Sequence, residues 1–345
     1  MILSLVTGNL LEIIGAKNVF YIGLGSSIAG CIIMYLSHSF GLFISGYLIV
    51  VTGSGILYVA NHSIIASIYE DNKTSSLMIL NMGNVAGLIV SPLIASMLLF
   101  IDIDWRIFYL ASLIFLIALM IILFKIRIPE ISRIEGNLRS LFTANRKIMS
   151  NAAFILCCIM IFFYIAIFNT FFMWFTSYFQ NIGIKTQISS LFLALYSTAI
   201  LIGMMLRNRL MRYFQEKKIL LSSFIISFFL LLGVLLIKDL VFKNILIVLY
   251  GIAIAGNFPI IFSIGSNLFP KYQSSASGLM IAFSNLGIIV FQYLSGYLSE
   301  YYSKNSVLYI NLFNILMMIV LTLILFYDRR FRQHGIIAGP DIKIS

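Results

Sequence analysis

The chain has 345 residues, of which 61% are hydrophobic and only 10% are charged. A soluble domain carries about a quarter charged residues, so this composition excludes a water-soluble globular protein and indicates that lipid is the solvent. The net charge of +11 would suggest a nucleic-acid partner in a soluble protein. Here it is interpreted by side of the membrane, and no nucleic-acid partner is expected.

Uncharged apolar runs follow one another along the chain. A membrane-spanning helix needs about 20 mostly apolar residues. Ten runs approach or exceed this length: residues 19–37, 40–68, 75–101, 107–124, 151–179, 187–206, 219–237, 244–269, 274–298 and 307–326. An eleventh run, residues 1–11, is too short to span alone. The sequence therefore predicts an all-α, polytopic membrane protein. Its cysteines lie inside these runs and are expected to pack as small hydrophobic residues.

The connectors between the runs are short and polar, and the longest, residues 125–147, divides the chain in two. If alternate connectors are assigned to one side, that side receives 18 of the 23 Lys and Arg residues. Basic residues favour cytoplasmic loops. We therefore expect an N-terminal bundle (1–124), a cytoplasmic linker (125–150), a C-terminal bundle (151–327) and a cytoplasmic tail (328–345), in a multi-pass protein of the cell inner membrane.

Two connectors, residues 8–17 and 203–212, resemble each other. Each has a glycine near a helix end, then charged residues in a turn, then a new helix. Many transporters are built from two repeated halves. In such a repeat, the partner of the run 151–179 would fall before Met1. We therefore expect the first half to lack its first helix and part of its second, roughly 40–50 residues of a two-times-six design.

Four short motifs follow one another in the first half. They are a gate loop with Gly8, Glu12, Gly15 and Lys17; a run at 49–55 with Thr52, Gly53 and Gly55; a run at 87–96 with Gly87, Ser91, Pro92 and Ala95; and a helix start with Trp105, Arg106 and Phe108. With them the chain resembles the major facilitator superfamily, and most of all the 12-helix drug:proton antiporters of the bicyclomycin-resistance-like branch. The resemblance implies two pseudo-symmetric bundles that work by alternating access. Two arginines of the family patterns are replaced here by Ile13 and Ile49.

The motifs also have plainer interpretations. Gly83, Gly87, Ser91 and Ala95 recur every fourth residue, so small side chains share one face, either for simple helix packing or for a tight interface used in alternating access. Pro92 removes a backbone hydrogen bond and can bend its helix. Glu12 and Lys17 are interpreted either as a gate lock or as two solvated charges worth about 0–1 kcal/mol.

Uncharged polar residues inside the runs are candidates for a substrate cavity. They are Tyr58, Asn61, Asn169, Trp174, Asn257, Asn285 and Gln292. Each alone can be explained by an interhelical hydrogen bond. As a set, with Phe171 and Phe172, they favour neutral or cationic amphiphiles. His62 is either a structural, hydrogen-bonded histidine or a proton-coupling group.

No catalytic motif or metal-ligand spacing is present, so neither an enzyme nor a cofactor is expected. The predicted function is secondary active transport of small organic molecules, as proton-coupled efflux of amphipathic drugs. Two alternatives remain. One is a sugar or amino acid proton symporter, since the segments 257–259 and 267–270 are similar to those of sugar:proton symporters; the other is an inactive truncated remnant. The expected partners are a small-molecule substrate, protons and the bilayer, and the chain is expected to be a monomer.

Overall fold

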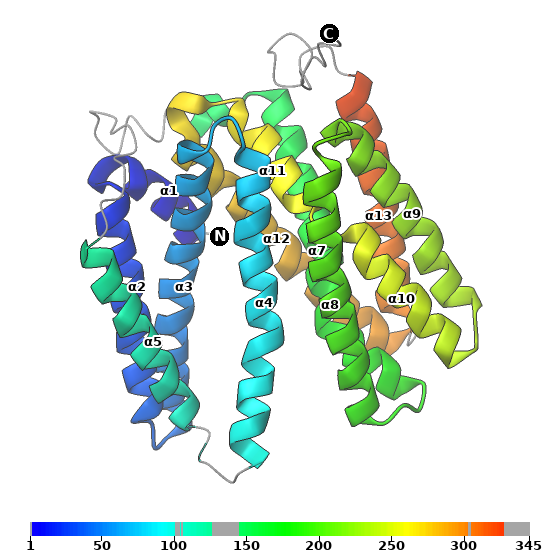
Figure 1. Cartoon of the computed structure of the whole chain (residues 1–345), viewed down its shortest axis with the longest axis horizontal. Coiled ribbons are helices and arrows are strands. Elements are labelled where there is room, and N and C mark those ends of the chain that lie inside the picture. The colour runs from blue at the N-terminus through cyan, green and yellow to red at the C-terminus, as the bar shows by residue number, and fades with distance from the viewer. Residues whose placement is uncertain (1, 101–103, 105, 126–144, 303–304, 328–345) are drawn as a thin grey trace. The chain divides into compact units, whose positions relative to one another are not determined.

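The computed structural model describes residues 2–100, 104, 106–125, 145–302 and 305–327. Within these residues the regular structure is entirely helical (Figure 1), which confirms the predicted all-α class. The helices are α1 (Ile2–Ile14), α2 (Ala16–Tyr35), α3 (Phe40–Ile68), α4 (Lys73–Phe100), α5 (Arg106–Lys125), α7 (Ala152–Asn181), α8 (Thr186–Leu210), α9 (Glu216–Leu236), α10 (Leu240–Ile254), α11 (Asn257–Asn267), α12 (Gln273–Tyr301) and α13 (Ser306–Tyr327), with a short 3-10 turn at Pro270–Tyr272.

Nine helical segments within the described residues are long and apolar enough to cross a bilayer. α4, with 28 residues, has the length of a span as well. α1 is shorter, with 13 residues, as expected for the run that cannot span alone. The chain is therefore a multi-pass membrane protein. The three cysteines, Cys31, Cys157 and Cys158, are free and buried, which confirms that they pack as hydrophobic residues.

The composition of the run 244–269 suggested one continuous helix, but the structure divides it into two. α10 ends at Ile254, and α11 begins at Asn257. Between them Gly256 adopts a left-handed conformation with φ of 73°, which a glycine accepts without steric cost. Pro259 lies in the first turn of α11, where its missing N–H is not needed by the helix. The two segments together still make a single apolar span, Leu240–Asn267.

Contacts divide the chain into two compact units. Unit 1 comprises Met1–Lys73, Gly87–Ile148 and Phe269–Ala282, and unit 2 comprises Thr74–Ala86, Met149–Leu268 and Phe283–Ser345. Helices α4 and α12 therefore contribute to both units. The division differs from a simple split at the 125–150 linker, because each unit contains a short segment from the other half of the chain. Residues 126–144 of that linker and the tail 328–345 lie outside the described residues.

The core of unit 1 is an antiparallel pair, α2 and α3, brought close by glycines. A Cβ added to Gly30 would lie 2.7 Å from the carbonyl oxygen of Gly46, and one added to Gly53 would lie 2.6 Å from that of Gly23. On each helix the two glycines are seven residues apart, so they fall on one face. Small residues let helix backbones approach closely in a membrane. Helices α1 and α5 pack against this pair.

The core of unit 2 is rich in aromatic side chains. On α7, Phe171 packs 5.1 Å from the ring of Tyr196 on α8 and 5.2 Å from that of Tyr250 on α10, measured between ring centroids. Phe175 lies 5.6 Å from Tyr196. Such offset and edge-to-face pairs add stability beyond the area that they bury. Phe171 is only 2% exposed, so it belongs to the core rather than to the surface of a substrate cavity.

We expect Gly30→Val to destabilise the protein by about 1–3 kcal/mol, because the added side chain would meet the backbone of α3. Gly25 lies on the same helix, and a Cβ there would meet nothing within 4 Å. The matched variant, Gly25→Val, is therefore expected to unfold at nearly the wild-type temperature. Thermal unfolding of the purified protein in detergent measures both. Equal losses in the two variants would show that helix propensity, not close packing, determines the effect.

Candidate functional site

The carboxylate of Glu12 meets the N-terminus of α12 inside unit 1. Glu12 Oε1 accepts a hydrogen bond of 2.9 Å from the backbone N–H of Ser275, in the first turn of α12. The first N–H groups of a helix have no partner within the helix and carry partial positive charge. Glu12 thus satisfies a donor 263 residues away in the sequence. The interaction joins the gate loop to a helix from the far end of the chain.

Gly8 makes this contact possible. A Cβ added to Gly8 would lie 2.7 Å from the carbonyl oxygen of Ser274 and 3.1 Å from Cα of Gly278. The backbones of α1 and α12 therefore touch one turn before Glu12. Gly15 separates α1 from α2 with φ of 82°, a conformation that glycine adopts readily. Both glycines of the gate loop thus have a specific geometric role.

The environment of Glu12 favours the protonated acid. Glu12 is 2% exposed, and its second oxygen, Oε2, is buried without a hydrogen-bond partner in the part of the chain that the structure describes. Burial raises the pKa of Glu12, and the hydrogen bond from Ser275 lowers it by a smaller amount. Lys17 Nζ lies 5.9 Å from the ring centre of Tyr21. The acid of the gate loop is thus bonded to the start of α12 and is buried, so it is not a solvated loop charge.

Further polar groups surround the same contact. Ser275 Oγ donates to Asn9 Oδ1 at 3.3 Å, and Asn145 Nδ2 donates to that same oxygen at 3.3 Å. Gln273 Nε2 donates to the carbonyl oxygen of Ala66 at 2.8 Å. Asn9, Gln273 and Ser275 were not identified from the sequence. The available signal for Gln273 and Ser275 was the serine-rich run 273–278 at the start of an apolar segment.

The residues of the run 49–55, which lies in α3, divide between packing and surface. Gly53 is buried against α2, and a Cβ on Gly55 would lie 3.2 Å from the Leu3 side chain of α1. Thr52 is exposed and donates to the carbonyl oxygen of Leu48. Gly23, Gly30 and Gly46, which complete the close pair of helices, were missed in the sequence. Their spacing of seven residues was the available signal.

His62 is fully buried in α3. Its Nδ1 lies 2.8 Å from the carbonyl oxygen of Tyr58, and the rings of Tyr58 and His62 are 4.2 Å apart. The structure thus brings together two of the residues singled out for the substrate pathway. Asn61, their neighbour, is partly buried.

The remaining cavity candidates lie in unit 2 and differ in their surroundings. Asn257 is fully buried; it accepts from Ser223 Oγ and donates to the carbonyl oxygen of Ile254, so it holds the break between α10 and α11. Asn169 donates to Ile165 of its own helix. Trp174 packs against Gly296, whose added Cβ would lie 3.0 Å from the indole. Asn285 and Gln292 are partly buried on α12.

The structure describes the run 87–96 only in part. Ser91, Pro92 and Ala95 lie in α4, and their side chains are outside the described residues. A Cβ added to Gly83 or Gly87 would meet nothing within 4 Å among the described atoms. The close packing expected of this small-residue face is therefore not seen at its two glycines.

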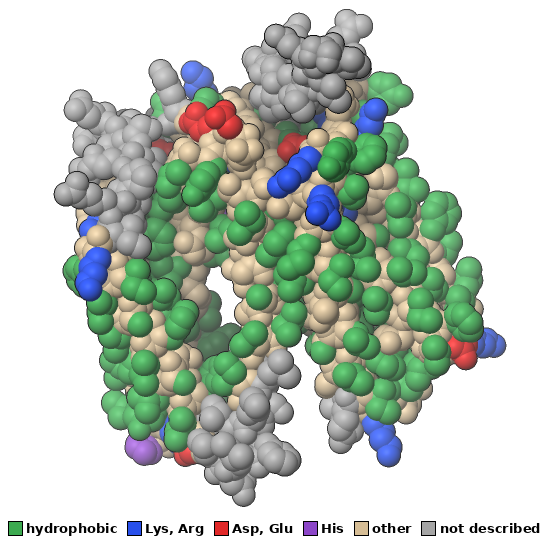
Figure 2. Space-filling view, viewed as in Figure 1, with side chains coloured by type: hydrophobic (Ala, Val, Ile, Leu, Met, Phe, Trp, Pro, Cys, Tyr) green, Lys and Arg blue, Asp and Glu red, His purple; other side chains and the backbone are tan. Residues whose placement is uncertain are grey.

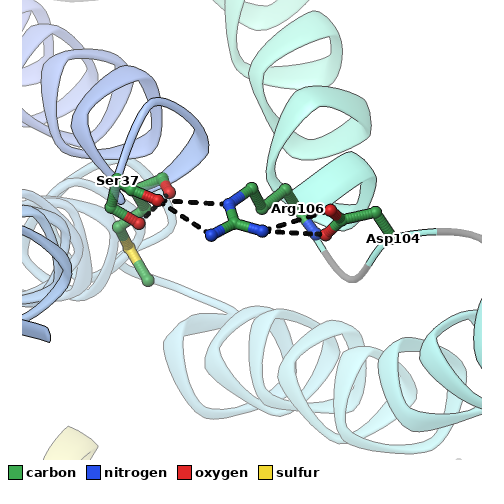
Figure 3. Close-up of polar contacts among 4 residues, drawn as sticks. Ser37, Asp104 and Arg106 are labelled. Carbon is green, nitrogen blue, oxygen red and sulfur yellow. Dashed lines mark hydrogen bonds and ion pairs between the residues drawn. The ribbon is translucent and has the colours of Figure 1, made fainter. Parts of the chain in front are cut away.

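Arg106 ties the start of α5 to the end of α2 (Figure 3). Its Nε and Nη2 both donate to the carbonyl oxygen of Ser37, at 3.2 and 3.0 Å, and Nη1 forms an ion pair of 3.1 Å with Asp104. The backbone N–H of Arg106 lowers the pKa of Asp104. In the same first turn of α5, the rings of Phe108 and Tyr109 meet edge to face. Trp105 lies outside the described residues.

Comparison with known proteins agrees with this architecture. The Major Facilitator Superfamily model matches residues 1–290 and, in a second alignment, 245–343. No curated protein matches the chain in sequence. Among solved structures, FucP in the outward conformation has a TM-score of 0.83 at 14% identity, over 94% of this chain and 86% of that chain. The human organic anion transporter MFSD10 (TETRAN) has 0.78 at 13%, over 92% and 80%, and the proton:xylose symporter XylE has 0.74 at 12%, over 95% and 84%.

We expect Glu12→Gln to raise the unfolding temperature at pH 7.5 and to have little effect near pH 4.5. Because burial raises the pKa of Glu12, the folded state binds the proton more readily than the unfolded chain. The contribution of Glu12 to stability is therefore fully present below its pKa in the unfolded chain, and it is lost as pH rises through its pKa in the folded protein. Unfolding temperatures between pH 4.5 and 8 measure this, with the exposed Glu300→Gln as control. A parallel pH profile for wild type and Glu12→Gln would contradict it.

Arg106→Lys should loosen the junction between α5 and the α2–α3 turn, because an ammonium cannot make the forked contact to the Ser37 carbonyl. The loss is expected to be about 1 kcal/mol, since the side chain is 30% exposed and water screens the pair. Hydrogen exchange of the amides at residues 37–40 measures it. Asp104→Asn removes only the exposed ion pair and should leave that exchange unchanged; if both variants accelerate it equally, the ion pair is the essential contact.

Proposed function

This chain belongs to the Major Facilitator Superfamily and is a secondary transporter; we propose that it exports amphipathic organic molecules, neutral or cationic, in exchange for protons. The placement of charge carries the proposal. Within the described helices, every Asp, Glu, Lys and Arg lies within four residues of a helix end. The middle of each helix offers substrates aromatic and uncharged polar groups. Without an arginine clamp there, phosphate and other multiply charged anions are poor substrates.

His62 is the proposed proton-coupling residue. Its neighbour Tyr58 supplies an aromatic face and a carbonyl acceptor for the imidazole. An intramembrane ionisable group is a functional candidate because its burial is costly. A proton on His62 would add charge beside the proposed pathway, so that binding of a cationic substrate and binding of a proton would oppose each other. This mutual exclusion is the basic requirement of exchange.

Export is supported by the likeness of the segments 8–17 and 87–96 to those of drug:proton antiporters. The gate loop, in this proposal, acts through Glu12 and the start of α12. When Glu12 accepts from the Ser275 N–H, the α1–α12 contact is closed, and loss of that bond accompanies opening. Because Glu12 is buried and its pKa is raised, protonation and opening are expected to influence each other.

Proton-coupled sugar uptake is the second candidate. It is favoured by the folds of FucP and XylE, of which XylE is described as a proton:xylose symporter, and by the segments 257–259 and 267–270. Everted vesicles that contain the full chain distinguish the two functions. Energised vesicles should accumulate ethidium under a proton gradient if the protein exports amphipathic cations. Proton-driven uptake of labelled fucose or xylose by right-side-out vesicles, with no ethidium transport, would favour symport instead.

The variant His62→Asn should lower gradient-driven accumulation of the substrate at least tenfold, while substrate exchange without a gradient continues. An asparagine amide can still donate to the Tyr58 carbonyl, but it cannot take up a proton near neutral pH. His38 lies exposed in the α2–α3 connector, so His38→Asn is the matched control and should transport normally. Normal accumulation by His62→Asn would exclude His62 as the coupling residue and leave the substrate class open.

A further inference from the structure

A groove opens on unit 2 between α8, α9 and α10. It has a volume of about 460 Å³, which is within the range of small-molecule sites. Its apolar walls come from three helices and include Leu206, Leu210, Phe214, Ile226 and Ile252. Several of these side chains are strongly exposed, with Leu210 at 44% and Phe214 at 57%. The groove therefore lies on the outer surface of these helices, where acyl chains are the expected neighbours.

Two basic residues line the groove. Arg207, from the last turn of α8, and Lys218, from the first turn of α9, both line it. Lys218 is exposed, whereas Arg207 is only 5% exposed. Five of the residues from 207 to 218 are Lys or Arg, against the single acid Glu216. Lys and Arg side chains are seen over this end of α8 in the space-filling view (Figure 2).

The charge of Arg207 is incompletely compensated. Nη2 donates to the carbonyl oxygen of Ala253 at 2.7 Å, and Nη1 is buried with no hydrogen-bond partner among the described residues. A buried charge without an opposite charge is costly. An anion held at the mouth of the groove would offset that cost, since the interaction acts through a medium of low dielectric constant.

We propose that this groove binds one anionic phospholipid of the surrounding bilayer. The phosphate lies at Lys218, within the field of Arg207, and an acyl chain follows Leu210, Phe214 and Ile226. Basic pockets between membrane helices are suited to anionic headgroups, and the apolar walls account for a lipid rather than a soluble anion. Gly203, which also lines the groove, lets the backbones of α8 and α10 come into contact beside it, because a Cβ there would lie 2.5 Å from the carbonyl oxygen of Ile252.

The proposal gives a role to the second copy of the repeated connector, residues 203–212. In the first copy, Gly8 precedes an acid, Glu12, that binds a helix N-terminus. In the second copy, Gly203 precedes a base, Arg207, at the same spacing of four residues. The two copies thus share a glycine contact but carry opposite charges. The lipid site is independent of which solute the protein transports.

Lipid retention by the purified full chain tests the proposal. The protein is extracted into mild detergent with equal amounts of phosphatidylglycerol and phosphatidylcholine, and bound lipid is measured by native mass spectrometry. The wild type should retain phosphatidylglycerol preferentially. Lys218→Gln should lower that retention about fivefold, the effect of one basic residue near a lipid surface. Ser222→Phe fills the groove without changing charge and should lower it as well.

Arg212→Gln is the matched control. Arg212 is exposed, lies in the same basic segment and does not line the groove, so its loss changes net charge equally and should leave retention within about twofold, since one distant charge is screened. Equal losses in Lys218→Gln and Arg212→Gln would overturn the site in favour of general surface attraction. Equal retention of the two lipids, or displacement of the bound lipid by millimolar inorganic phosphate, would also overturn it. Unfolding temperatures identify a variant that fails to fold. If Ser222→Phe does so, the test rests on Lys218→Gln, because that position is exposed.

Discussion

Lipid as the solvent imposes one constraint on which the rest of this structure depends: every backbone N–H and carbonyl at membrane depth must find its partner within the protein. Continuous helices meet that requirement, and where the chain departs from them a side chain replaces the missing bond. At the break after Ile254, Gly256 takes a left-handed conformation and Asn257 donates to the Ile254 carbonyl. At the start of α12, Glu12 accepts from an N–H that the helix leaves free. The cost of placing a charge in lipid likewise keeps the charged side chains of the described helices near the helix ends.

Close contacts between backbones hold each unit together, because side-chain burial gains little where lipid is as apolar as the protein. In unit 1, Gly23 and Gly30 of α2 meet Gly53 and Gly46 of α3. In unit 2, Gly287 approaches the backbone of Phe162 so closely that an added Cβ would meet its carbonyl oxygen. Aromatic rings fill the wider spaces. Transport requires contacts that can also be broken. The polar α1–α12 junction, in which one carboxylate oxygen of Glu12 has no partner among the residues described, is better suited to that than the glycine pairs.

The spans could be predicted from hydropathy, because twenty apolar residues have few other uses. The family likeness followed from residues such as Gly8, Gly15 and Pro92 in order. The sequence could not show which residues far apart in the chain contact each other. Glu12 was interpreted with its neighbour Lys17, either as a gate lock or as a solvated charge, and nothing nearby in the sequence indicated Ser275, which lies 263 residues away. Phe171 was assigned to a cavity because its aromatic type fits both a cavity and a core. The break at Gly256 was signalled by Gly256 and Pro259, but the apolar run on either side concealed it.

The three buried cysteines have a practical consequence for spectroscopy. Cys31 is 3% exposed, and Cys157 and Cys158 are fully buried, so thiol reagents in water should reach none of them in the folded protein. A single cysteine introduced at an exposed position would then carry a fluorophore or spin label against a low native background, without first replacing the natural residues. Distances between pairs of such labels, recorded with and without a proton gradient, would give the amplitude of the transport cycle directly.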